Sequence, residues 1–307
     1  APPVANFSFT PSNPTTSDTI FFEDKSYDSD GSIVDWIWNF DDGNVSKGGI
    51  GLQFDGIDDY INIPDDPTLD LTQFTIEAWI KRNSMGTRDV IVNKLGSYLL
   101  MVESDDTLTA WLYSGGSIAK IVKGPTIDTN WHYVAITYDG SSVKLYVDGS
   151  ICTTSSFSGT LDATSKTLRI GLADQYWGKP GYFDGIIDDV RIYNKALTAS
   201  EIQQNCNGNV ITTGLVSWWK FNEGSGSIAH DSIGSNDGTI NGCSWIKCIR
   251  HRYTSAGTYD VTLSIEDDDA LTDSITKQVI VKAPPVANFS FTPSNPTTSD
   301  TIFFEDK

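Results

Sequence analysis

Apolar and polar residues alternate with a period of two along most of the chain. The pattern is clearest in three stretches, residues 74–80, 142–149 and 257–269. Such alternation puts successive side chains on opposite faces of a β-strand. Turn sequences rich in Gly, Asn, Asp and Ser, such as "YDGSS" and "GSND", separate these stretches. Many short alternating strands with such turns predict an all-β fold built from sandwiches or barrels.

One segment departs from this pattern. In "LTASEIQQN", residues 197–205, Thr198 and Glu201 have the spacing of a capping box, and Ile202 supplies an apolar contact. The segment therefore predicts a helix of one or two turns.

The length of 307 residues allows two domains or one large one. The formal net charge of −19 argues against nucleic acid as a partner, because binding to phosphates needs an excess of Lys and Arg. No apolar run approaches the roughly 20 residues of a membrane span, so we expect no membrane insertion. The four cysteines, at positions 152, 206, 243 and 248, allow three disulfide pairings, and the sequence leaves the choice open.

The chain contains an exact internal repeat. Residues 1–25 and 283–307 are identical, and the repeat distance is 282 residues. Two changes of composition lie between the copies, a Gly-rich stretch at 44–51 and a locally basic stretch at 243–253. We therefore expect residues 1–48 and 249–282 to form two parts of one domain, with residues 49–248 inserted. Residues 283–307 are then the first strands of the next repeat.

The flanking parts carry two specific motifs. "SYDSDGSIVDWIWNFDDGN" begins at Ser26, and "HRYTSAGTYDVTLSIEDDDALTDS" begins at His251. With these motifs the flanks resemble a PKD (polycystic kidney disease) domain, which implies a small immunoglobulin-like sandwich.

The insert resembles a laminin-G-like, concanavalin-type jelly roll. The resemblance rests on "GLQFDGIDDYINIPDDPTLDLTQFTIEAWIK", "NWHYVAITYDGSSVKLYVDGS" and "YFDGIIDDVRIYNKALTASEI". Residues 214–246 look like the first strands of that family but follow the last ones, so the insert is expected to be circularly permuted. The fold class predicted for the whole chain is all-β, an immunoglobulin-like PKD sandwich with an inserted laminin-G-like jelly-roll sandwich.

Both resemblances imply calcium as a cofactor, which the oxygen-rich turns of an acidic chain would suit. In the flanks the candidate ligands are Asn6, Asp28 and Asp30. In the insert, the loops "FDGIDDY" and "HDSIGSNDG" offer Asp58, Asp231, Asn236 and Asp237. The alternative is that these side chains are solvated turn residues.

Exposed aromatic side chains would be the sign of a glycan site. The loop "DQYWGKPGY" supplies Tyr176, Trp177 and Tyr182, which we expect to stack on a sugar or to contact a protein. The alternative is that they fold back over the sandwich. The other tryptophans considered lie on strand patterns and are predicted to be in the core: Trp79, Trp111, Trp131, Trp218 and Trp219.

The sequence predicts no enzyme. It lacks a Ser-His-Asp order and any metalloprotease motif. Asp58 and Asp59 are adjacent on a strand pattern, as are Asp188 and Asp189, and adjacent strand residues point to opposite faces, so neither pair forms a catalytic dyad alone. Asp188 and Asp189 are expected to cap or hydrogen-bond a neighbouring turn.

The exact repeat favours one function above the others. Unselected duplicates drift, so 25 unchanged residues indicate a recent duplication or a homogenised array. We therefore expect an extracellular or cell-surface structural or adhesive repeat protein, one unit of a tandem array or filament whose partners are neighbouring copies of itself. The alternative is a carbohydrate-binding module with PKD spacers, accessory to a secreted enzyme. Further expected partners are glycans or cell-surface proteins.

Overall fold

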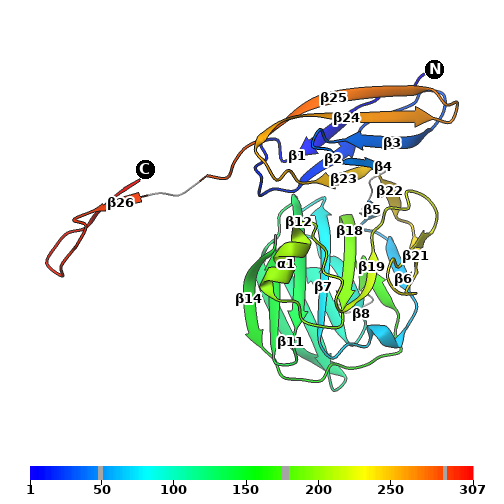
Figure 1. The fold of residues 1–307 in the computed structure, drawn as a ribbon. Helices are drawn as coiled ribbons and strands as arrows, with labels where there is room; N and C mark the ends of the chain where they lie inside the picture. Colours follow the sequence, from blue (N-terminus) through cyan, green and yellow to red (C-terminus); the bar gives the residue numbers. More distant parts are fainter. Residues whose placement is uncertain (48–50, 174–179, 286–288, 307) are drawn as a thin grey trace. The chain divides into compact units, whose positions relative to one another are not determined.

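The computed structural model describes residues 1–47, 51–173, 180–285 and 289–306. The chain forms two compact units, one made of residues 1–46 and 250–307 and the other of residues 47–249 (Figure 1). Within the described residues, strands dominate, and the helical elements are α1 (Ala199–Cys206) and the 3-10 turn η1 (Pro67–Leu69). The predicted all-β class is confirmed. None of the described helices has the length and apolar character needed to cross a membrane.

The first unit contains two small antiparallel sheets. One sheet has the order β1 (Phe7–Thr10), β2 (Ile20–Asp24) and β23 (Cys248–His251). The other has the order β25 (Thr272–Val281), β24 (Gly257–Asp267), β3 (Ile33–Asn39) and β4 (Val45–Lys47). Strands from the two ends of the unit's sequence pair directly, with Trp38 of β3 opposite Leu263 of β24.

An aromatic core lies in the first unit. Phe7, Phe22 and Trp38 are each at most 1% exposed, and the rings of Phe7 and Trp38 meet edge to face at 5.2 Å. In the middle of β24, Val261, Leu263 and Ile265 are buried while the polar residues between them are less buried, as the alternation predicts. The burial of these large rings supplies most of the stabilisation of so small a sandwich.

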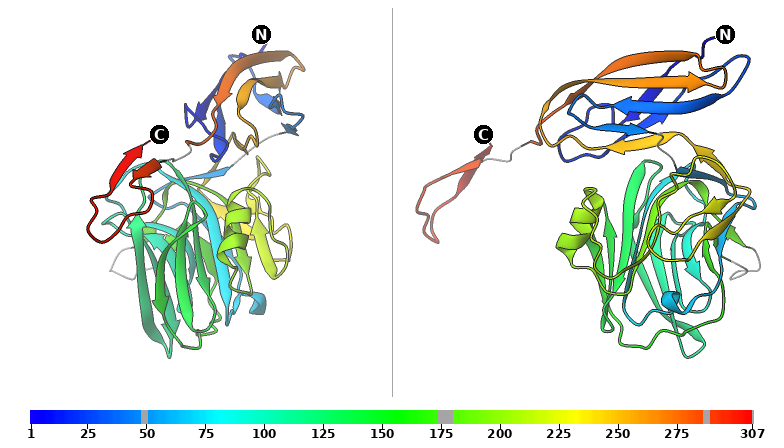
Figure 2. Two further views of the ribbon diagram at one scale, coloured as in Figure 1. Left: turned by 60° about the vertical axis from the view of Figure 1, so that its left-hand side comes forward. Right: turned by 45° about the vertical axis from the view of Figure 1, so that its right-hand side comes forward.

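The second unit is a sandwich of two eight-stranded sheets, seen from two further sides in Figure 2. The first sheet has the order β11 (Ser117–Thr126), β10 (Thr107–Ser114), β9 (Tyr98–Val102), β8 (Asp89–Lys94), β15 (Leu168–Ile170), β6 (Tyr60–Ile63), β21 (Gly238–Asn241) and β20 (Ile228–Ala229). The second has the order β14 (Ser150–Ser156), β13 (Ser142–Val147), β12 (Trp131–Tyr138), β7 (Phe74–Arg82), β18 (Asp184–Tyr193), β5 (Gly51–Asp55) and β22 (Ser244–Ile246), with β19 (Leu215–Trp219) beside β18. A short pair, β16 (Leu172–Ala173) and β17 (Gly181–Tyr182), stands apart from both sheets.

A single large apolar cluster fills the space between these two sheets. It includes Ile76 and Ile136 from one sheet and Val92 and Leu100 from the other, none of them more than 1% exposed. The alternation seen in the sequence thus directs one face of each sheet into a shared core.

The strands that follow α1 complete this sandwich. β19 pairs with β18, β21 with β6, and β22 with β5. In the last of these pairs Gly51 lies opposite Ile246, so the first and last strands of the unit are neighbours. Helix α1 begins as predicted, because Thr198 accepts from the Glu201 N–H and the Glu201 side chain accepts from the Thr198 N–H.

A separate hairpin contains the second copy of the repeat. β26 (Phe289–Thr292) and β27 (Phe303–Asp306) pair in a two-stranded sheet. Phe291 lies opposite Phe304, just as Phe9 lies opposite Phe22 in the first copy.

Candidate functional site

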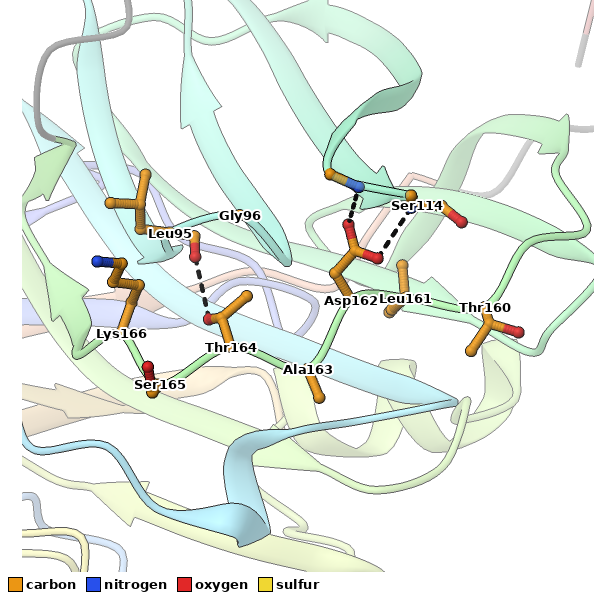
Figure 3. Close-up of a pocket in the computed structure, with 12 residues that line it drawn as sticks. Leu95, Gly96, Ser114, Thr160, Leu161, Asp162, Ala163, Thr164, Ser165 and Lys166 are labelled. Atoms are coloured by element: carbon orange, nitrogen blue, oxygen red, sulfur yellow. Dashed lines mark hydrogen bonds between the residues drawn. The ribbon is translucent and has the colours of Figure 1, made fainter.

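A depression in the second unit is lined by three loops that are far apart in the sequence. These are the β8–β9 turn at Leu95 and Gly96, the β10–β11 turn at 114–116, and the segment 160–166 before β15 (Figure 3). The depression has a volume of about 780 Å³. Two of these loops are turns of the first sheet, and the third leads from β14 of the second sheet to β15 of the first. The shape of the depression therefore depends on how the loops are held together.

Asp162 and Thr164 hold these loops in place. The two carboxylate oxygens of Asp162 accept hydrogen bonds from the N–H groups of Gly115, at 2.9 Å, and Gly116, at 2.8 Å. Both glycines have positive φ, a conformation that glycine adopts without steric cost. The Thr164 hydroxyl donates to the Leu95 carbonyl at 3.1 Å. Side-chain to backbone bonds therefore fix the rim before any ligand binds.

The lining combines polar and apolar groups. Hydroxyl groups come from Ser114, Thr160 and Ser165, the ammonium group from Lys166, and an apolar floor from Leu161. None of the described residues that line it is aromatic. Asp162 is the one carboxylate there, and both its oxygens are already bound to backbone. The depression can donate and accept hydrogen bonds but offers no pair of carboxylates for acid–base chemistry.

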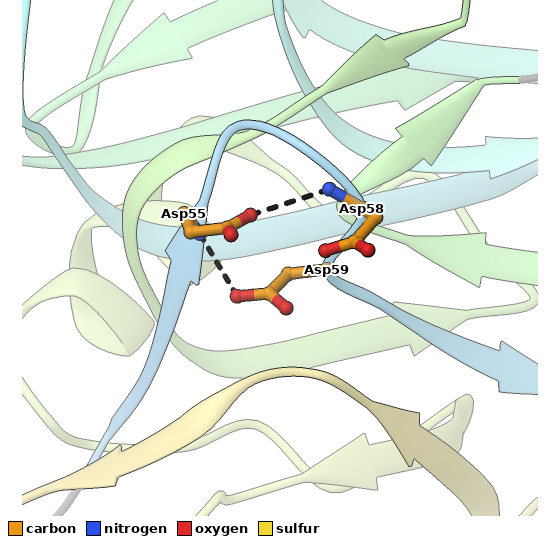
Figure 4. Close-up of side chains that lie close together, drawn as sticks. All are labelled: Asp55, Asp58 and Asp59. Carbon is orange, nitrogen blue, oxygen red and sulfur yellow. Dashed lines mark hydrogen bonds between the residues drawn. The ribbon is translucent and has the colours of Figure 1, made fainter.

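Three aspartates lie together where β5 ends. The ligand atoms of Asp55, Asp58 and Asp59 lie within 4.8 Å of one another (Figure 4). Asp55 Oδ1 accepts from the Ile57 N–H at 2.8 Å and from the Asp58 N–H at 3.3 Å. Asp59 Oδ2 accepts from the Asp55 N–H at 2.9 Å. These bonds curl the loop "DGIDD" so that its carboxylates converge.

Within the described part of the chain, no basic side chain is paired with the carboxylates of this cluster. Asp59 is 6% exposed, and its burial, together with the charges of Asp55 and Asp58, raises the pKa of its carboxyl group. None of the three forms an ion pair with a described Lys, Arg or His. A cation bound by their oxygens would relieve the repulsion, and carboxylate oxygens on a turn are ligands that Ca²⁺ accepts.

The other predicted metal ligands of the second unit have structural partners. Asp231 accepts from the Trp218 N–H at 2.9 Å and from the Asn236 N–H at 3.1 Å. Asp237 accepts from the Asp231 N–H at 2.7 Å and contacts His230 at 3.0 Å. Among the acidic, His and Cys groups of the described residues, Asp231 and Asp237 do not belong to a cluster of three. Of this set, only Asp58 lies in the aspartate cluster.

The predicted ligands of the first unit also have partners. Asn6 Oδ1 accepts from the Lys277 ammonium at 2.8 Å. Asp28 accepts from the Asp30 N–H at 3.3 Å, and Asp30 pairs with the amino group of Ala1 at 2.6 Å. The positive charge of Lys277 therefore already lies next to Asn6.

The predicted aromatic site is only partly described. Tyr176 and Trp177 lie outside the described residues, and Tyr182 is half-buried in β17 opposite Leu172. The core assignment is correct for Trp79, Trp111 and Trp219, which are at most 6% exposed. Trp131 and Trp218 are half-buried instead.

Asp189 lies in a buried network of charged side chains. It forms an ion pair with Arg191, which also contacts Glu77 at 2.7 Å. β18 is irregular between Asp188 and Arg191, with a positive φ at Asp189, and Arg191 lies directly opposite Glu77 of β7. Asn205 of α1 donates to Glu77 at 2.9 Å, so the network lies beneath the helix. Its burial and the two ion pairs that Arg191 forms in it indicate a structural role.

Comparison with known proteins agrees with this architecture. A family model described as the concanavalin A-like lectin/glucanases superfamily matches residues 55–203. These residues form a concanavalin A-like domain. No curated protein matches the chain. The resemblance of the first unit to a PKD domain stays a prediction.

The comparison with solved structures found matches at low sequence identity. A candidate carbohydrate-binding protein of Bacteroides ovatus is 19% identical, with a TM-score of 0.56 over 75% of this chain and 68% of that one. A pentraxin of Limulus polyphemus is 18% identical, with a TM-score of 0.45 over 65% of this chain and 95% of that one. The CBM40 of a Ruminococcus gnavus sialidase is 17% identical, with a TM-score of 0.40 over 50% and 96%.

Proposed function

We propose that the protein is a non-catalytic, extracellular carbohydrate-binding module whose concanavalin A-like domain binds glycans in the depression beside Asp162. The observation that carries the proposal is a polar depression of the concanavalin A-like domain, whose rim is fixed by hydrogen bonds and whose lining holds one carboxylate and not two. Glycoside hydrolysis generally needs two carboxyl groups facing the scissile bond. The likeness to the Bacteroides ovatus protein supports binding as well.

The lining suggests how a sugar would be held. The hydroxyls of Thr160 and Ser165 donate to and accept from sugar hydroxyls, while Lys166 donates to a ring substituent or pairs with an acidic one. The Leu161 side chain supplies apolar contact for the carbon face of the ring. Because Asp162 fixes the rim in advance, little entropy is lost on binding.

A glycan array followed by calorimetry tests this proposal. The combined variant Thr160→Ala with Lys166→Ala should weaken binding of the best glycan by at least about tenfold, since two polar contacts are lost. The matched variant Thr154→Ala removes an exposed hydroxyl of β14 that does not line the depression and should bind like the wild type. Equal binding by all three proteins would place the glycan elsewhere.

We also propose that the aspartate cluster at 55, 58 and 59 binds calcium and stiffens the loop after β5. Calcium added to metal-free protein should raise the melting temperature of the second unit, because a ligand of the native state stabilises it by mass action. Asp58→Asn should reduce the increase, whereas Asp269→Asn, which changes an exposed turn residue of the first unit, should leave it unchanged. An identical increase in both variants would rule out this site.

A second candidate function is the structural or adhesive repeat protein. The identity of residues 1–25 and 283–307 favours it, because two copies of one strand pair in a chain provide matching ends for neighbouring units. Glycan binding and a role as a repeat protein are compatible. The proposed glycan site lies in the second unit, whereas both copies of the repeated segment belong to the first.

A further inference from the structure

The hairpin of β26 and β27 has apolar side chains on its surface. Phe289 is 61% exposed, Phe303 is 68% exposed and Phe304 is 69% exposed. Among the described residues, β26 and β27 pair only with each other. Soluble proteins seldom leave such a cluster of large apolar side chains uncovered, so the hairpin resembles half of an interface.

The same sequence in the first copy identifies what covers it. The counterparts of these residues, Phe7, Phe21 and Phe22, are at most 5% exposed. Phe22 packs against Trp38 at 5.9 Å and Phe40 at 5.3 Å between ring centroids. On the side away from β1, β2 pairs with β23. We call Trp38, Phe40, β23 and Lys282 together the acceptor face.

Polar contacts at one end of the acceptor face recognise the loop between β1 and β2. The Lys282 N–H donates to the Pro14 carbonyl at 2.8 Å, and the Thr16 N–H donates to the Lys282 carbonyl at 2.9 Å. Arg252 Nε donates to the Thr16 carbonyl at 3.0 Å. Because these contacts use the backbone of residues 14–16, the identical loop at 296–298 can make them as well.

The hairpin already has the shape that the acceptor face requires. The register of β26 and β27 reproduces that of β1 and β2 residue by residue. Thr297 bonds to Asp300 at 2.7 Å as Thr15 does to Asp18. Docking would therefore order little chain, and it would bury the hairpin's apolar side chains where those of residues 1–25 are buried now.

We propose that residues 289–305 dock on the acceptor face of another molecule of this chain, where they take the place of that molecule's own residues 1–25. This inference deepens the repeat-protein proposal and is independent of glycan binding. Since the two segments are identical, exchange between them is nearly neutral in free energy. Occupancy is therefore decided by which segment is present and correctly folded next to a given acceptor face.

A second copy fits better than the hairpin's own chain. Lys282 lies beside Pro14, at the loop end of the first copy. To return to its own acceptor face, the chain would have to run back from Lys282 along the whole length of residues 7–14. The six residues 283–288 could cover that distance only when fully extended.

Identical substitutions in the two copies of the full chain test the proposal. Phe22→Asp places a charge in the first copy's core and should release residues 1–25, so that the hairpin of another chain takes their place. We expect this variant to keep a folded first unit and to have a mass of two chains or more by sedimentation. Phe304→Asp should stay monomeric and as stable as the wild type. The double variant should neither fold the first unit nor associate.

Hydrogen exchange distinguishes docking from unspecific aggregation. In Phe22→Asp the amides of β27 should gain protection, and those of β2 should lose it. A folded monomer of Phe22→Asp would overturn the assignment to a second copy. Association that persists in the double variant, or an unfolded first unit in Phe22→Asp alone, would overturn the docking itself. Glycan binding by the second unit should be unchanged in all variants, so failure here leaves that proposal standing.

Discussion

Residues 1–25 and 283–307 share one sequence and one local structure but lie in different surroundings. In both copies the two strands pair in the same register, and the rings of the first and last phenylalanines approach each other, Phe7 and Phe22 at 6.1 Å and Phe289 and Phe304 at 5.7 Å. Yet Phe22 is fully buried, whereas Phe304 is 69% exposed. The local sequence thus determines the pairing and register of the hairpin, whereas strands from distant parts of the chain determine whether it is buried.

The comparison separates two contributions that usually cannot be separated. A turn, a register and a cross-strand pair need only neighbouring residues. A core needs a partner with a complementary face, here Trp38 and Phe40. Two strands alone are marginally stable in water, so the covering strands supply most of the free energy of folding.

The largest expected difference between the copies comes from shortening one ring. Phe22→Ala should lower the free energy of unfolding of the first unit by about 3–5 kcal/mol, because it leaves a cavity beside Trp38 and Phe40. Phe304→Ala should change it by less than about 0.5 kcal/mol, because residues 1–25 fill the acceptor face of the wild type and leave the Phe304 ring exposed. Urea unfolding followed by tryptophan fluorescence measures both. Equal losses in the two variants would show that the hairpin is covered in solution.

A smaller effect should follow from a contact that Lys277 makes with the first copy. The Lys277 ammonium bonds to Asn6 at 2.8 Å and lies 5.0 Å from the centre of the Phe7 ring. Lys277→Met should lower the free energy of unfolding by about 1 kcal/mol, through loss of a charged hydrogen bond and a cation–π contact.

Lys25→Met serves as the matched control for this prediction. Lys25 pairs with Glu23 on the surface, and exposed pairs contribute little to stability. Its unfolding curve should overlay that of the wild type. If both lysine variants behave alike, the Lys277 contacts do not help to hold the first copy.

The smallest expected effect is a pH dependence of the first unit's stability. It arises from His251, which packs on Phe40, and not from the hairpin residues. His251 stacks on Phe40 at 4.1 Å, and burial lowers the pKa of its imidazole below 6.5, although Asp42 opposes this. The unfolded chain therefore binds the proton more readily than the folded one, and the stability present above pH 6.5 is lost as the pH falls through the folded pKa. The melting temperature of the first unit should drop between pH 7.5 and 5.5.

His251→Gln removes the titrating group and tests the assignment. The difference in melting temperature between the two pH values should become smaller in this variant, and calorimetry of the first unit's transition measures it. An unchanged difference would assign the pH effect to another group.

Local signals in the sequence predicted the elements well. The alternation gave the strands, and the capping box of Thr198 and Glu201 gave the start of α1. The aspartate cluster was found only in part. Strand alternation places Asp58 and Asp59 on opposite faces, but Asp59 turns back to the Asp55 N–H, a loop geometry that periodicity does not encode.

The remaining features depend on contacts between distant residues. The depression is built from loops near positions 95, 115 and 162 and carries no aromatic signal. The Glu77–Arg191 pair needs the irregularity of β18 and the helix above it. No sequence motif or residue spacing predicts such a site, because its residues come together only after the sheet has formed.

The pairing of Gly51 with Ile246 bears on the order in which the chain folds. β3 and β24 must meet although the whole second unit lies between them, and each doubling of a flexible loop adds about 0.6 kcal/mol to the entropy of closing it. Once the second unit has folded, its two ends are neighbours. A flexible loop of roughly 200 residues is then replaced by a short rigid connection, which removes about 2–3 kcal/mol of the entropic cost of closing it. The first unit should therefore fold after the second, and a variant that slows folding of the second unit should delay both.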